Sequence, residues 1–114
     1  MSERSEKVLL IDMLETAEVV RSMAGVTVDA FMKNEDLRDA TVYRLQTIGE
    51  AAYNISDPLK GKWPEVDWFK IQGLRHRIVH DYGNIDDVQI HRIANKYVPP
   101  LVEQLKKILE AGEV

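Results

Sequence analysis

Apolar residues recur at the spacing of an α-helix along most of the chain. The first such stretch runs from about Ser5 to Ala24, where an apolar side chain returns every three or four residues. Its apolar positions are Leu9, Leu10, Met13, Leu14, Ala17, Val20 and Ala24. Ser5 is suited to cap the start of this helix, and Gly25 is suited to end it. Just beyond, Thr27 is placed to cap a short helix of one or two turns that includes Phe31.

A second long helix is predicted from about Asn34 to Ile55. Asn34 is a natural N-cap, and the acidic Glu35 and Asp36 suit the positive end of the helix dipole. The apolar stripe of this helix is formed by Leu37, Ala40, Leu45, Ile48, Ala52 and Ile55. Gly49 inside the helix costs roughly 1 kcal/mol relative to alanine, so we expect another helix to pack closely against it.

The segment from Ser56 to Val66 lacks any such periodicity. It contains two prolines, one glycine and four charged residues, and we predict that it forms the main loop. After it, Asp67 is placed to cap a third helix, from about Trp68 to Tyr82, which Gly83-Asn84 would end.

A fourth helix is predicted from about Val88 to Leu109, with Asp86 or Asp87 as its cap. Its apolar face is formed by Ile90, Ala94, Tyr97, Leu101, Leu105 and Ile108. This face keeps its phase across Pro99-Pro100. We therefore interpret the two prolines as a kink within one helix and not as its end.

These elements predict an all-α fold. No segment alternates with a period of two, and the chain has no internal repeat. We expect an up-and-down bundle of four main helices plus a short helix, forming a single domain over residues 1–114. Trp63 and Trp68 are expected to anchor the long loop to this bundle.

Composition narrows the classes of function. The chain has no cysteine, which excludes disulfides, thiolate metal sites and a cysteine nucleophile, and fits a cytoplasmic protein. The first residues are too charged for a signal peptide, and no window approaches the roughly 20 apolar residues of a membrane span. The net charge of −4 argues against a protein that grips long nucleic acid nonspecifically, but not against an enzyme with a local positive site.

The predicted third helix carries most of the candidate chemistry. Arg75 borders its apolar ridge, where a charge is costly unless it is paired, with Glu50 or Asp81 for example, or bound to an anion. His80 is five residues further on, about 140° around the helix. The two side chains would therefore meet only through dimerisation or if Arg75 reached around. His76 and His80 have the spacing of half a metal site, but with no third ligand and two nearby arginines we expect no metal.

Several blocks of the chain resemble the HepT-like branch of the HEPN superfamily. Arg75 to Tyr82 (RHRIVHDY) matches the R-x4-H-x-Y pattern of the superfamily, with His76 where asparagine is commoner. Ile48 to Ala51 resembles its I-G-E-A block, and Arg38 and Arg44 stand as the basic lead-in to that block. Trp63-Pro64 with the following WFKIQGL, Ile85-Asp86 and the proline-containing last helix also fit. The resemblance extends from about Leu9 to Leu109.

The resemblance implies a metal-independent endoribonuclease that acts as a homodimer and requires no cofactor. Its substrate would be RNA, whose own 2′-OH would attack the phosphate. His80 would then serve as the general base and Arg75 as the donor that stabilises the crowded phosphate. His76 would support the phosphate, and Glu50 would either pair with Arg75 or Arg44 inside the bundle or act on the substrate. In a two-fold dimer both motifs would line one cleft.

The resemblance also implies a partner. HepT-like proteins are toxins of type II toxin–antitoxin systems, and their antitoxin is a minimal nucleotidyltransferase that adds AMP to the motif tyrosine, here Tyr82. The homodimer could also form a larger hetero-oligomer with that antitoxin. The alternative is a non-catalytic HEPN protein that binds and regulates a nucleotidyltransferase or binds a nucleotide. A plain helical dimerisation module is a third reading, but it leaves Arg75 and His80 without a role.

Overall fold

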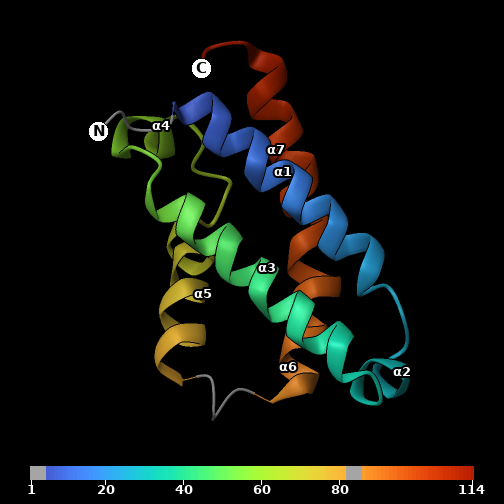
Figure 1. Cartoon of the computed structure of the whole chain (residues 1–114). Coiled ribbons are helices and arrows are strands. Elements are labelled where there is room, and N and C mark those ends of the chain that lie inside the picture. The colour runs from blue at the N-terminus through green and yellow to red at the C-terminus, as the bar shows by residue number, and fades with distance from the viewer. Residues whose placement is uncertain (1–4, 82–85) are drawn as a thin grey trace.

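The computed structural model describes residues 5–81 and 86–114, and for residues 77–81 it describes the backbone alone. Every regular element in these ranges is helical, which confirms the predicted all-α fold (Figure 1). The elements are α1 (Glu6–Met23), α2 (Val28–Met32), α3 (Glu35–Tyr53), α4 (Asp57–Lys62), α5 (Trp68–Asp81), α6 (Asp87–Arg92), the π-helical turn η2 (Ile93–Tyr97) and α7 (Val98–Ala111). The predicted stop at Gly83-Asn84 lies outside the described residues.

The predicted helix caps are present. Each side chain accepts a hydrogen bond from a backbone N–H in the first turn of its helix, at 3.1 Å for Ser5 and Thr27, 3.0 Å for Asn34 and Asp67, and 2.8 Å for Asp86. These bonds satisfy donors that have no partner within the helix. The five helix starts were therefore encoded locally and could be predicted from sequence.

The predicted loop after α3 is wrong in part, because it contains the short helix α4. The Ser56 hydroxyl caps this helix by accepting a hydrogen bond from the N–H of Leu59 at 3.4 Å. Pro58 lies in the first turn, where its missing N–H costs nothing. Leu59 is buried and ties the turn to the core. The anchoring role of the tryptophans is confirmed, since the buried Trp68 donates its indole N–H to the carbonyl of Trp63 at 3.0 Å.

The chain stays helical through Pro99-Pro100, as predicted, but the irregularity has a different form from a simple proline kink. The five residues before Val98 form the π-helical turn η2. Two successive prolines cannot donate to carbonyls one turn back, and a π-helical turn is one way in which a helix absorbs such a defect. No feature of the sequence indicated this turn.

Successive main helices run in alternate directions, as expected for an up-and-down bundle (Figure 1). Helix α3 packs against both α1 and α5, and α1 packs against α7. The core between them is apolar, and its largest fully buried side chains include Leu10, Met13, Phe31, Leu45, Ile48, Leu105 and Ile108. Helix α5 is held to the bundle mainly through α3. None of the described helices is both long and apolar enough to span a bilayer.

Candidate functional site

Helix α5 lies in backbone contact with α3 at Gly49. A Cβ atom at this position would lie 2.7 Å from the backbone nitrogen of Arg75 and 3.0 Å from the carbonyl oxygen of Ile71. Any side chain would therefore force the two helices apart. This confirms the close packing predicted for Gly49, and it fixes the backbone of Arg75 against α3.

The side chain of Arg75 lies against the last turns of α3. Its Nε forms an ion pair with the carboxylate of Glu50, and its guanidinium lies over the ring of Tyr53, with 4.8 Å between the guanidinium carbon and the ring centroid. The structure thus pairs Arg75 with Glu50, which is one of the ion pairs predicted from the sequence. The side chain of Arg75 remains 41% exposed, so the guanidinium is held at the surface and is accessible to an anion.

The opposite side of α5 is open. Phe69 is 84% exposed, His76 is exposed, and a Cβ atom on Gly73 would meet no atom of the described residues within 4 Å. Residue 80 follows Gly73 by seven positions, or two turns, and so falls on the same side of the helix. This outer side of α5 thus combines an exposed phenylalanine with two histidine positions of the motif.

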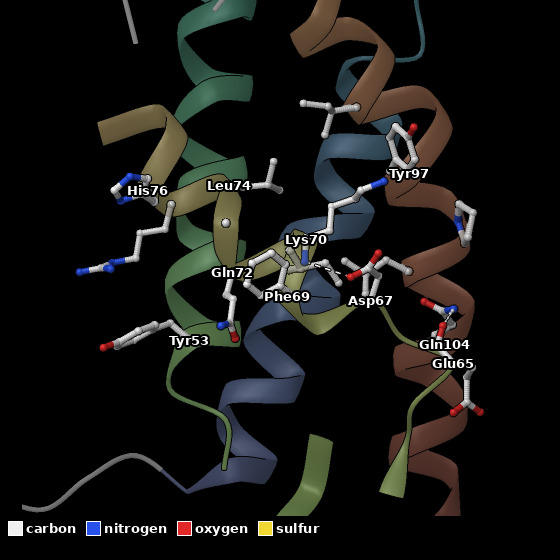
Figure 2. Close-up of a pocket in the computed structure, with 16 residues that line it drawn as sticks. Tyr53, Glu65, Asp67, Phe69, Lys70, Gln72, Leu74, His76, Tyr97 and Gln104 are labelled. Atoms are coloured by element: carbon white, nitrogen blue, oxygen red, sulfur yellow. Dashed lines mark hydrogen bonds between the residues drawn. The ribbon is translucent and has the colours of Figure 1, made fainter. Parts of the chain in front are cut away.

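A groove of about 890 Å³ runs along this side of α5 toward η2 and α7, and it is lined mainly by apolar atoms (Figure 2). Tyr53 and His76 stand on one flank and Tyr97 and Gln104 on the other. Lys70 lies between them, with its ammonium 4.6 Å from the centroid of the Tyr97 ring. The groove therefore has a cation stacked on a tyrosine at each border, Arg75 at one and Lys70 at the other.

The structure places the predicted catalytic pair only in part. Arg75 is on the α3 side of α5, and residue 80 is on the outer side, in keeping with the 140° offset expected from their spacing. The side chain of His80 and all of Tyr82 lie outside the described residues. Among the described side chains, no cluster of three or more histidine, aspartate or glutamate residues is arranged to hold a metal ion.

Two blocks that carry the sequence resemblance meet in space. Gly49 and Glu50 belong to one block and Arg75 to the other, and they form the α3–α5 contact described above. The family model of HepT-like ribonucleases matches residues 13–108. The chain belongs to the HepT-like ribonuclease family. This confirms the resemblance and accounts for most of the chain.

Relatives of this HepT-like chain cover nearly its whole length. "Putative RNase MJ1380" from Methanocaldococcus jannaschii is 32% identical over 107 residues, which are 93% of this chain and 98% of the relative. "Putative RNase TTE0752" from Caldanaerobacter subterraneus subsp. tengcongensis is 30% identical, with 81% and 82% of the two chains covered. "Probable ribonuclease HepT" from Thermococcus cleftensis is 25% identical, with 93% and 97% covered. No solved structure matches the chain significantly.

Sequence reasoning missed two aromatic residues of the site. Tyr53 follows Gly49 by four positions, so the rule that residues four apart share a helix face could have placed it beside the α5 contact. Phe69 is an apolar residue on the polar side of the predicted third helix, and this mismatch was a signal for an exposed apolar surface.

Proposed function

We propose that this HepT-like protein is a metal-independent endoribonuclease that acts as a homodimer. The observation that carries the proposal is the placement of Arg75. Its side chain is held at the surface by an ion pair with Glu50 of α3, and it lies on α5, the helix that also bears His80. The family match and the ribonuclease names of its relatives support RNA as the substrate. An anchored guanidinium and a histidine that meet in one cleft are suited to the cleavage of a phosphodiester.

The proposed reaction needs only the RNA and protein side chains. His80 accepts the proton of the 2′-OH, the 2′-oxygen bonds to phosphorus, and the bond to the 5′-oxygen breaks. The leaving oxygen takes a proton from a second histidine, either His76 or the partner copy's motif. Arg75 stabilises the negative charge that builds on the phosphate oxygens. The products are a 2′,3′-cyclic phosphate and a 5′-hydroxyl end.

A second copy of the chain is the proposed occupant of the apolar groove. Phe69 is 84% exposed on a surface lined mainly by apolar atoms, so covering it with a second copy would be favourable, and Gly73 nearby offers no steric obstacle to a neighbouring helix. A two-fold interface brings the same surface of both copies together. In such a dimer the motif of one copy completes that of the other. The angle of about 140° between Arg75 and His80 on one helix then does not prevent the two residue types from sharing a cleft.

Cleavage by the purified protein tests this function. Wild-type protein should cut single-stranded RNA in the presence of EDTA and leave 2′,3′-cyclic phosphate ends, whereas His80→Ala should leave the RNA intact. Expression of the wild type alone should also slow growth, and expression of His80→Ala should not. Wild-type protein that cuts no RNA under these conditions would contradict the proposal and favour a non-catalytic partner of a nucleotidyltransferase.

We further propose that the protein is the toxin of a type II toxin–antitoxin pair and that a nucleotidyltransferase antitoxin attaches AMP to Tyr82. Tyr82 is two residues from His80, so an added phosphate would repel the phosphates of RNA and block the cleft. Mass spectrometry of protein co-expressed with the nucleotidyltransferase should find AMP on the peptide that contains Tyr82. A peptide that is never modified, in a complex that nevertheless lacks activity, would mean that inhibition works by binding alone.

A further inference from the structure

The guanidinium of Arg75 has a neighbour that the proposed reaction does not use. Gly49, Glu50 and Tyr53 lie within the last two turns of α3, and each contacts Arg75 or would contact it with an added Cβ atom. Gly49 admits its backbone, Glu50 holds its Nε, and the ring of Tyr53 lies beneath the guanidinium. Helix α3 thus contacts the arginine at its backbone, at its Nε and, through the Tyr53 ring, at its guanidinium carbon.

The ion pair by itself is a weak restraint on this side chain. Its two members are 41% and 52% exposed, and ion pairs so close to water are weakened by solvent and salt. A carboxylate at Nε also leaves the guanidinium free to rotate about that contact. An aromatic ring restricts this rotation, because a guanidinium is attracted to the face of the ring and stacks on it.

We propose that Tyr53 is a positioning residue for Arg75, which orients the guanidinium toward the scissile phosphate. This inference rests on the proposed ribonuclease function. With Nε engaged by Glu50, the two Nη groups are the donors suited to paired hydrogen bonds with phosphate oxygens. A ring that fixes the plane of these donors in advance lowers the cost of aligning them as the phosphate becomes crowded.

Tyr43 provides a matched control for Tyr53. It is a tyrosine on the same helix and is 68% exposed, compared with 56% for Tyr53. The cation–π contacts of the described side chains involve Tyr53 and Tyr97 but not Tyr43. Removing either ring therefore exposes a similar amount of helix surface, and only one removal releases Arg75.

The first experiment compares Tyr53→Leu, Tyr53→Phe and Tyr43→Leu in steady-state cleavage of a short RNA. Loss of a cation–π contact at an exposed site predicts a fall in kcat of about fivefold for Tyr53→Leu, with KM little changed. Tyr53→Phe keeps the ring and should cleave like the wild type, as should Tyr43→Leu. Equal kcat values for Tyr53→Leu and Tyr43→Leu would overturn the proposal. If Tyr53→Leu does not fold, Tyr53→Gln takes its place.

A second readout does not depend on activity. In protein with ¹⁵N-labelled arginine, the Nε–H signal of Arg75 should exchange faster with water in Tyr53→Leu than in the wild type, and Tyr43→Leu should have no effect. Identical exchange in Tyr53→Leu and wild type would overturn the positioning role. If the wild type cuts no RNA, the ribonuclease proposal fails by itself, and this exchange rate still decides whether the ring orders the arginine.

Discussion

The two glycines that face opposite sides of α5 have opposite surroundings. Gly49 of α3 meets the inner side of α5, where a Cβ atom would lie 2.7 Å from the backbone of Arg75. Gly73 of α5 belongs to its outer side, where a Cβ atom would meet none of the described atoms within 4 Å. The inner side is a finished contact, in which glycine is required by close packing. The outer side has a glycine for which the described part of the chain provides no packing reason.

This difference teaches which half of the site one chain can build alone. The inner side holds Arg75 through Glu50 and Tyr53, so the group that we propose to bind the phosphate is positioned by intramolecular packing. On the outer side Phe69 is exposed to solvent, and residue 80 falls on the same side of the helix by its position. We infer that the acid–base half of the site is completed by a second copy. The predictions that follow test one side at a time.

The largest expected effect is on cleavage, when the two sides are inactivated in separate molecules. Arg75→Ala and His80→Ala should each lose about 10²–10⁴-fold in kcat, the range for removing a group that moves protons or stabilises charge. A mixture of the two, refolded together, should regain cleavage, because a mixed dimer contains one intact arginine and one intact histidine in the shared cleft. The measurement is the initial rate of RNA cleavage by the mixture.

The control for this mixture is each variant refolded with itself. If the mixture is no more active than either variant, the arginine and histidine of one site come from the same chain, and the division of labour between the two sides of α5 is wrong. The rate should also depend on total protein concentration, since we propose that the dimer is the active form.

The next largest effect is on stability, when the inner side is disturbed. Gly49→Ala places a methyl group against backbone atoms of α5 that cannot move independently of the helix. We expect a loss of about 1–3 kcal/mol in the free energy of unfolding, despite the better helix propensity of alanine. Urea denaturation measures the loss. Gly61→Ala in α4 is the matched control and should not be destabilised, because the added atom lies more than 4 Å from every atom of the described residues that could obstruct it.

The success of sequence reasoning followed the range of the interactions. The helix caps depend on hydrogen bonds between residues three apart, so the residue type at each cap position was enough to predict them. These caps are Ser5, Thr27, Asn34, Asp67 and Asp86. The close approach at Gly49 could be predicted because a glycine inside a helix needs a packing reason. Helix α4 was missed because the glycine and the two prolines of this segment were interpreted as loop signals. In fact Ser56 caps the helix and Pro58 lies in its first turn, where proline is favourable.

The site was less predictable because its contacts join different helices. Periodicity placed Arg75 at the border of an apolar face but left its partner open between Glu50 and Asp81. Tyr53 is 22 positions before Arg75, and only the packing of α3 on α5 brings them together. The exposure of Phe69 likewise depends on which helices leave α5 uncovered.

A smaller effect is expected on association, when the outer side is disturbed. Phe69→Lys should weaken the dimer about tenfold or more, since truncation of a central aromatic residue typically costs over 1 kcal/mol of binding free energy. Cleavage should fall at low protein concentration and recover at high concentration. Because Phe69 is 84% exposed in the single chain, the free energy of unfolding of the monomer should stay nearly the same.

Analytical ultracentrifugation measures this association directly. Val88→Lys is a suitable control, because Val88 is also an exposed apolar residue, at 49%, but does not line the groove. A wild-type protein that remains monomeric at concentrations where it cuts RNA would refute the role assigned to the outer side.

The smallest expected effect is also the most discriminating between the two glycines. Gly73→Ala should raise the free energy of unfolding of the monomer by about 1 kcal/mol, because alanine favours the helix and the added methyl group meets no described atom within 4 Å. In the dimer the same methyl group would lie where a second helix approaches. The gain measured by urea denaturation should therefore shrink or reverse as protein concentration rises through the dimer dissociation constant. If the gain in the free energy of unfolding is the same at all concentrations, the second copy does not bind at Gly73, and this glycine only lowers the stability of α5. A reversal would give the outer glycine the same reason as Gly49, supplied by another molecule.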